Sequence, residues 1–221
     1  MAMSVRKLVD LVGLRMAYKI AEKRFVSIES FLNNLTFADL ERYLEHFSGN
    51  FGDFDLFTDP LKHRLMETAS SFSDWHRLYQ HIYSGRDWER VILDSLIEKA
   101  DTLEELLIVS GIMLSCANHI INDKEGDPDL SAVDPYASIR RDILVKIGQK
   151  TQEIMDATDC SGGCFNVDRP TLRFIFTALS CIYDNARLEL TLSSRPDPQF
   201  ILMRDKALEN LRILTAFERS A

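Results

Sequence analysis

Two cysteines flank a Gly-Gly turn in the segment Cys160-Ser161-Gly162-Gly163-Cys164. Thiols this close in sequence can form a small-loop disulfide or supply two ligands to a metal site. A redox pair normally has two intervening residues, whereas three separate Cys160 from Cys164, and no histidine lies nearby in sequence. We interpret the segment as a connection between helices with incidental thiols. A thiol redox-sensing role for Cys160 and Cys164 is the alternative.

A second candidate is the pair His119 and Asp123, which lie four residues apart on a predicted helix. This spacing places both on one helix face, where they could bind a divalent metal together with a ligand from another helix. The chain contains no His-Glu-x-x-His, phosphate-loop or Gly-x-Ser-x-Gly sequence. His119 would also complement the dipole at the end of its helix, and we favour that structural role. A metal-dependent hydrolase is the alternative.

Aromatic side chains concentrate around the predicted turn Ser84-Gly85-Arg86-Asp87. Trp and Tyr anchor protein interfaces well because they are large and lose little rotamer entropy. Trp75 falls on the apolar stripe of the preceding helix, so we expect it inside the fold. The residues predicted to form a partner-binding patch are His76, Tyr83, Arg86 and Trp88.

The composition is that of an ordinary globular chain. The 221 residues are 46% hydrophobic and 27% charged, which excludes a disordered, collagen-like or disulfide-dense protein. The net charge of −8 argues against a nucleic-acid partner, because phosphate binding depends on clustered positive charge. Four cysteines are too few for a stapled secreted domain, so we expect a reducing, cytoplasmic compartment.

Charge is distributed unevenly along the chain. Residues 1–26 contain six basic and two acidic residues, a net charge of +4, so the remaining 195 residues carry −12. Apolar residues recur at helical spacing from Val5 to Ile20. We expect a first helix packed on an acidic body. A targeting arm or a membrane-surface helix is the alternative for this segment.

Helices are predicted throughout. No sustained period-two alternation and no Asn-Gly or Asp-Gly turn occurs in the sequence, so strands are not expected. The uncharged run 106–122 is short for crossing a membrane and contains polar residues, so it is predicted to be the buried central helix of a bundle, with no transmembrane segment. The fold class is therefore all-α, with about nine helices near residues 4–24, 36–48, 60–70, 72–84, 88–100, 103–122, 135–157, 170–193 and 198–218.

A weak internal repeat runs through the first half of the chain. Shifting the sequence by 31 residues aligns 65–69, which reads LMETA, with 96–100, which reads LIEKA. After each of these segments, and once before them, a hydroxyl residue is followed three positions later by an acid. This is the capping-box pattern, which satisfies backbone N–H groups at the start of a helix. The predicted boxes are Thr36 with Asp39, Ser71 with Asp74, and Thr102 with Glu105.

The repeating unit is thus a helix, a tight turn and a capped helix, and it resembles the units of HEAT and tetratricopeptide helical-repeat proteins over roughly residues 35–109. Trp75-His76-Arg77-Leu78-Tyr79 supplies the early Trp and Leu of a tetratricopeptide unit, with Tyr79 where that family has glycine. Chance capping boxes in an all-α bundle are the alternative. The resemblance implies stacked antiparallel helical hairpins that bind proteins by shape and need no cofactor.

These patterns predict one all-α domain over residues 1–221. It comprises a basic N-terminal helix (1–26), a helical-hairpin region (35–122) and longer C-terminal helices (123–221). The predicted function is that of a non-enzymatic protein-binding adaptor. Because the body of the chain is acidic, we expect a partner with a basic segment.

Overall fold

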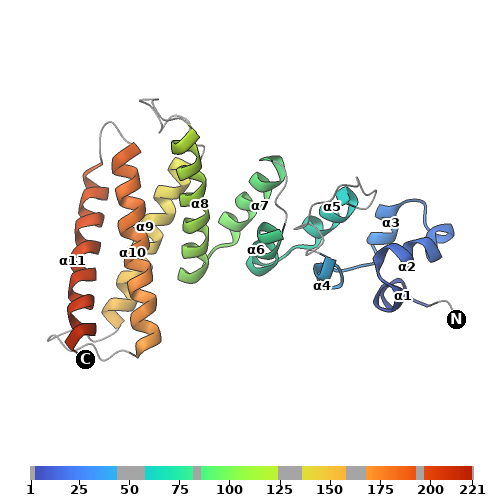
Figure 1. Ribbon diagram of the computed structural model, residues 1–221, viewed down its shortest axis with the longest axis horizontal. Coiled ribbons are helices and arrows are strands. Elements are labelled where there is room, and N and C mark those ends of the chain that lie inside the picture. The colour runs from blue at the N-terminus through green and yellow to red at the C-terminus, as the bar shows by residue number, and fades with distance from the viewer. Residues whose placement is uncertain are drawn as a thin grey trace. The chain divides into compact units, whose positions relative to one another are not determined.

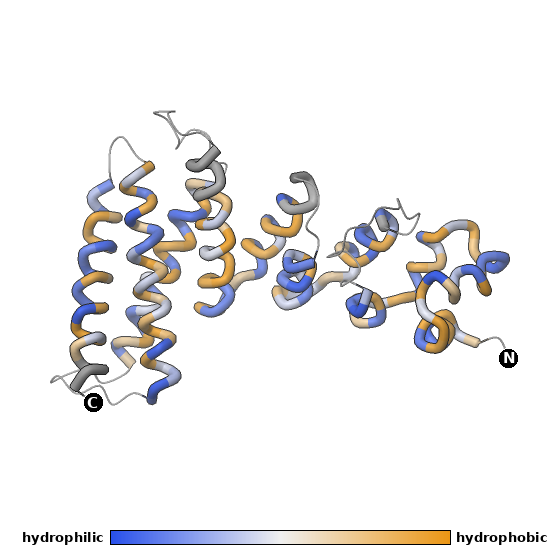
Figure 2. Tube along the Cα trace, viewed as in Figure 1, coloured by the Kyte–Doolittle hydropathy of each residue, from blue (hydrophilic) through white to orange (hydrophobic). Residues whose placement is uncertain are grey.

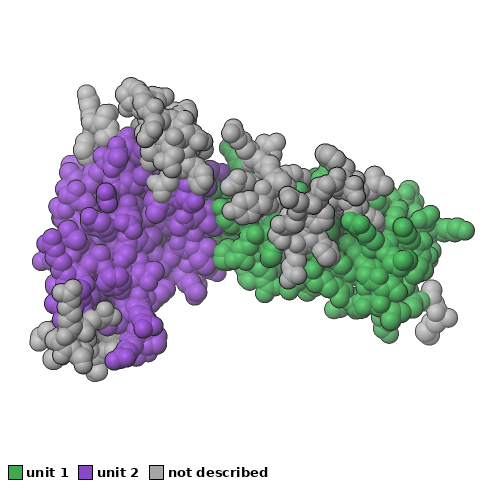
Figure 3. Space-filling model, viewed as in Figure 1, with its two compact units in different colours: residues 1–99 green, residues 100–221 purple. Residues whose placement is uncertain are grey.

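The computed structural model describes residues 3–43, 58–81, 86–123, 136–157, 168–192 and 197–220. Every regular element in these ranges is a helix, which confirms the all-α fold class (Figure 1). The chain divides into two compact units, residues 1–99 and 100–221 (Figure 3), and each is described by itself.

The first unit is built from short helices. Successive elements pack on their neighbours: α1 on α2, α3 and α4 on α5, α5 on α6, and α6 on α7. The elements are α1 (Val5–Val12), α2 (Leu14–Ala21), the 3₁₀ turn η1 (Glu22–Arg24), α3 (Ile28–Leu32), α4 (Phe37–Leu40), α5 (Thr58–Thr68), α6 (Phe72–His81) and α7 (Arg86–Lys99).

The predicted first helix, 4–24, is wrong as one continuous element, because Gly13 interrupts it. Gly13 has φ +80° and ψ 164°, a conformation almost restricted to glycine. Its N–H donates to the Val9 carbonyl at 2.9 Å and ends α1, while its own carbonyl accepts from Ala17 at 2.9 Å and begins α2. With this break and the unpredicted α3, the described residues contain eleven α-helices where about nine were expected.

Phe31 forms the centre of the N-terminal packing. Its side chain is fully buried, and the rings of Tyr18 and Phe25 each contact it edge-on with centroids 5.4 Å away. Such edge-to-face contacts add to the stabilisation that burial itself provides. α2, the segment after η1, and α3 are therefore held together by one aromatic cluster.

All three predicted capping boxes are present. In each, the carboxylate accepts a hydrogen bond from the backbone N–H of the hydroxyl residue, and the hydroxyl accepts one from the N–H of the acid. The carboxylate contacts measure 3.0 Å at Thr36 and Asp39, 3.0 Å at Ser71 and Asp74, and 2.9 Å at Thr102 and Glu105. The return contacts measure 3.4, 3.1 and 3.2 Å in the same order.

The second unit is a bundle of four long helices, α8 (Leu103–Asp123), α9 (Ala137–Ala157), α10 (Arg169–Leu192) and α11 (Pro198–Ser220). Successive helices run antiparallel (Figure 1). Figure 2 shows polar and apolar stretches alternating along them, as expected for helices with one buried face.

The central helix of this bundle is α10, which packs against α8, α9 and α11. The prediction that 106–122 forms the central helix of the bundle is therefore wrong. α8 buries a stripe that includes Leu106, Val109 and Met113, whereas Gly111 and Ser115 on its other side are exposed. A mainly apolar sequence is compatible with burial on every face, but Gly111 and Ser115 are exposed in the structure.

Candidate functional site

The predicted partner-binding patch is described in part. Trp75 is buried, as expected, and His76 one residue later is half-buried. Burial lowers the pKa of His76, because it disfavours the charged ring. Tyr83 lies outside the described residues. Arg86 and Trp88 lie in the first turn of α7, but their side chains are not described, so the patch stays a prediction.

The two alternative sites fall largely outside the described part of the chain. His119 and Asp123 lie four residues apart in the last turns of α8, as predicted, but their side chains are not described. Cys160 and Cys164 lie outside the described residues. Among the side chains that are described, no group of three or more His, Cys, Asp or Glu residues is arranged to bind a metal ion.

A groove of about 540 Å³ lies in the second unit between α9 and α11, with α10 beneath it. Its base is formed by Leu179 and Ile182 of α10, both of which are buried. Its apolar walls comprise Val145 and Gly148 of α9 and Leu202 and Met203 of α11. We call this feature the α9–α11 groove.

The groove exists because α9 and α11 both pack on α10. α11 buries Phe200, Ala207 and Leu214, which are seven residues apart and so share one face of the helix. The groove is narrow where Met203 of α11 faces Gly148 of α9. A Cβ at Gly148 would lie only 3.2 Å from Met203 Cε. The missing side chain thus allows Met203 to approach α9 closely.

Polar side chains bridge one part of the groove's rim. Lys206 Nζ donates a hydrogen bond to Gln152 Oε1 at 3.1 Å, and Gln152 Nε2 donates to Asp156 Oδ1 at 2.7 Å. Glu153 and Asp156 are exposed on the α9 side of this rim. The rim is therefore acidic along the last turns of α9, with Lys206 already engaged across the groove.

Leu202 gives the groove its exposed apolar contact. Its side chain is 69% exposed although it lines the α11 wall. An apolar base with a polar rim is the usual construction of a site that binds an apolar ligand or an amphipathic helix. The chemistry that this arrangement supports is therefore binding.

Buried polar contacts hold the helices that form the groove. Arg140 of α9 and Glu189 of α10 are 1% and 2% exposed, and Arg140 Nε donates to Glu189 Oε1 at 2.8 Å. Arg141 Nε donates to the other carboxylate oxygen of Glu189 at 2.7 Å. Charges removed from water in this way require a close partner, so the contacts fix the position of α9 along α10.

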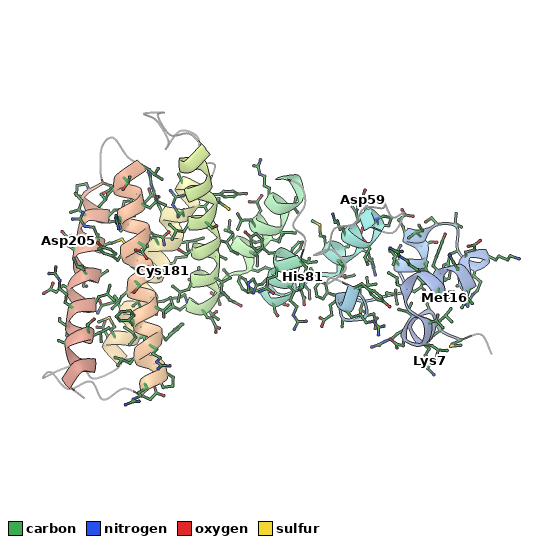
Figure 4. All side chains as sticks on the ribbon, viewed as in Figure 1. Lys7, Met16, Asp59, His81, Cys181 and Asp205 are labelled. Carbon is green, nitrogen blue, oxygen red and sulfur yellow. The ribbon has the colours of Figure 1, made fainter. Side chains whose placement is uncertain are left out.

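A second polar contact joins α10 to α8. Cys181, labelled in Figure 4, donates from its Sγ to Ser110 Oγ at 3.3 Å. Burial raises the pKa of the Cys181 thiol, because the thiolate is poorly solvated there. Asn185 is fully buried beside it and donates from Nδ2 to the Cys181 carbonyl at 2.9 Å.

The sequence did not indicate the groove. Leu202 and Met203 read as part of an ordinary helical stripe, and the base of the groove comes from residues about twenty positions earlier in the chain. The one local signal was Gly148 in the middle of a predicted helix, because a glycine inside a helix often marks a close approach.

No helix among the described residues has the combination of length and hydrophobicity that crossing a membrane requires. The chain matches no protein-family model, no curated protein and no solved structure.

Proposed function

We propose that the protein is a helical binding module that takes up an amphipathic helix of a partner protein in the α9–α11 groove. The observation that carries this proposal is an apolar groove of about 540 Å³ with Leu202 exposed at its wall. Helix-in-groove recognition uses such a surface, with apolar anchors of the partner at helical spacing entering the groove.

The acidic rim of the groove determines which charges the polar face of a partner helix should carry. Glu153 and Asp156 border the groove, and residues 100–221 contain 19 acidic against 13 basic residues. A partner helix with Lys or Arg beside its apolar stripe would be attracted to this rim, whereas an acidic helix would be repelled. The proposed partner segment is therefore a basic amphipathic helix.

Two labelled model peptides test this proposal with the full chain. Both are amphipathic helices of about 18 residues with the same leucine stripe, and their polar faces carry either lysine or glutamate. We expect the lysine peptide to bind and its affinity to fall with added salt. Equal affinity for both peptides, or affinity independent of salt, would contradict the charge assignment.

A matched pair of variants places the binding site. Leu202→Asp introduces a charge into the groove and should weaken binding of the lysine peptide about tenfold or more. Ile213→Asp is the control, because Ile213 is 50% exposed on the same helix and does not line the groove. Loss of binding in both variants, or in neither, would argue against the groove.

We also propose that α5, α6 and α7 are stacked as helical hairpins of a repeat. Their sequential contacts and the capping box at Ser71 support this arrangement. In a repeat array each unit depends chiefly on its neighbours. Leu78→Ala in α6 should therefore increase amide hydrogen exchange most in α5, α6 and α7. A uniform increase over the whole chain would contradict the stacked arrangement.

A further inference from the structure

Exposed apolar side chains are concentrated at the start of the chain. Eleven large apolar residues are exposed among the described side chains, and six of them lie between residues 3 and 26. They occupy α1, α2 and the segments that flank these helices. The six residues are Met3, Leu11, Val12, Met16, Ile20 and Val26.

Apolar and cationic side chains share one face of α2. Met16 and Ile20 are 52% and 58% exposed and lie four residues apart, and the exposed Lys19 and Lys23 follow each of them by three. These spacings place all four on the same side of the helix and of the turn that continues it. We call this the basic apolar face.

The opposite side of α2 is committed to the fold. Leu14, Ala17 and Ala21 are buried there. The basic apolar face is therefore the solvent side of a helix that is already packed. Met16 on α2 and Lys7 on α1 are labelled in Figure 4.

The charge of this region is strongly positive once its ion pairs are considered. Of the two acids in residues 1–26, Asp10 pairs with Arg42 at 2.5 Å. Arg6 pairs with the buried Asp39 at 2.7 Å. Lys7, Lys19, Lys23 and Arg24 outnumber the one further acid of this segment, Glu22, so the exposed apolar residues lie among cations.

A polar pocket of about 360 Å³ lies at the start of α1. Two guanidinium groups, a hydroxyl and an amide line it. Arg6 already pairs with Asp39, and the Asn34 amide donates to the Ser30 and Phe31 carbonyls. Arg24 is therefore the group in this pocket that we assign to a phosphate oxygen. Arg24 in this pocket directly follows Lys23 of the basic apolar face. The polar lining residues are Ser4, Arg6, Arg24 and Asn34.

We propose that α1, α2 and η1 bind the surface of a bilayer that contains anionic phospholipids. Met16 and Ile20 enter the boundary between headgroups and acyl chains, while Lys19 and Lys23 reach the phosphates. The pocket at Arg24 receives the phosphate of one headgroup. This function is separate from helix binding in the α9–α11 groove.

A bilayer fits these observations better than an acidic protein does. The six exposed apolar residues are spread over two helices and their flanks, and the pocket beside them is polar. A protein partner needs a complementary packed surface, whereas fluid lipid accommodates scattered apolar side chains. The charge of +4 in residues 1–26 against −12 in the rest of the chain also makes this segment the part that an anionic surface would attract.

Co-sedimentation of the full chain with vesicles tests the proposal. Vesicles of phosphatidylcholine with phosphatidylserine should bind the protein at low salt, and vesicles of phosphatidylcholine alone should bind it weakly. Each lysine near an anionic surface contributes about fivefold to the partition coefficient. Lys19→Glu with Lys23→Glu should therefore lower the coefficient by about 25-fold or more. Lys146→Glu with Lys150→Glu is the matched control, since these lysines have the same spacing on α9.

Met16→Glu with Ile20→Glu should abolish vesicle binding, whereas Val91→Glu with Ile213→Glu, at two other exposed apolar positions, should leave it unchanged. Circular dichroism verifies that each variant is folded. The proposal is overturned if wild type fails to bind anionic vesicles at low salt. It is also overturned if the Met16→Glu, Ile20→Glu variant binds vesicles as well as its control, Val91→Glu with Ile213→Glu. Binding to soluble polyglutamate but not to vesicles would assign the face to an acidic protein. Full displacement by free glycerophosphoserine would reduce it to a soluble phosphate site.

Discussion

At the scale of single residues, the helix boundaries depend on hydrogen bonds that local sequence can specify. The capping boxes were predicted from a hydroxyl and an acid three residues apart, and each forms as predicted because both partners belong to the same turn. The break at Gly13 was not predicted, because a glycine inside a helical pattern is compatible with either a kinked or a continuous helix.

Gly13→Ala should destabilise the protein by about 1–3 kcal/mol, since its conformation is nearly restricted to glycine. The loss of stability would come from the strained backbone conformation and not from a steric clash, because a Cβ at position 13 would meet no atom within 4 Å. Gly111→Ala in α8 is the control, since it is equally uncrowded but helical, and it should stabilise by about 0.5–1 kcal/mol. Thermal melting measures both changes, and the same sign for the two would contradict the prediction.

The Glu105 capping box should make stability depend on pH. The backbone N–H groups of Thr102 and Asp101 donate to the carboxylate and lower the pKa of Glu105. Because the folded pKa is depressed, ionised Glu105 stabilises the fold fully at pH values above its unfolded pKa. That stabilisation is lost as the pH falls through the folded pKa.

Glu105→Gln should therefore lower stability by about 0.3–1 kcal/mol near neutral pH, because it removes a negative charge from the start of α8. The difference from wild type should be smaller at about pH 3 than near neutral pH, because more of the Glu105 carboxyl is protonated at the lower pH. Melting temperatures of the two proteins at both pH values measure the effect. A difference that is the same at both values would show that the charge of Glu105 does not stabilise the helix.

At the scale of elements, the sequence predicted which segments are helical better than it predicted how they pack. Apolar periodicity locates α8 to α11, because each helix needs one buried stripe. The periodicity did not show that α10 lies at the centre, since its sequence carries the charged Glu189 that becomes buried. Burial of that charge depends on Arg140, 49 residues away in sequence.

Arg140→Met should destabilise the second unit by about 3–5 kcal/mol, because it leaves the buried Glu189 without its principal partner. Arg140→Met with Glu189→Leu removes both charges and should recover much of that loss. Chemical denaturation of the two variants measures the difference. A double variant no more stable than the single one would show that the pair contributes specific packing rather than charge compensation.

At the scale of the whole molecule, the charge asymmetry could be predicted from the sequence by counting residues, whereas the α9–α11 groove could not be predicted from it. Residues 1–26 carry +4 and the rest −12 whatever the fold. The groove requires three helices to meet with Gly148 facing Met203, a relation between residues 55 positions apart. Periodicity specifies which face of a helix is buried, but not the neighbour that covers it.

Deletion of residues 1–26 should lower the melting temperature of the chain. It removes Arg6 from the buried Asp39 and takes away several core side chains. Calorimetry of the deleted and full chains measures the loss, and the one-domain prediction adds that the full chain melts in one transition. An unchanged melting temperature would show that this segment is a detachable arm. The core residues removed are Val5, Leu8, Val9, Leu14, Ala17 and Ala21.

The thiol of Cys181 gives the bundle a kinetic reporter of its own. Alkylating reagents attack thiolates, and burial holds this thiol protonated against Ser110. Labelling by iodoacetamide would therefore wait for α8 and α10 to separate. Peptide mass spectrometry identifies the labelled cysteine, and the rate of labelling at Cys181 then reports how often the two helices separate. A helix peptide bound in the α9–α11 groove should slow this labelling if α8 and α11 separate from α10 as one cooperative unit.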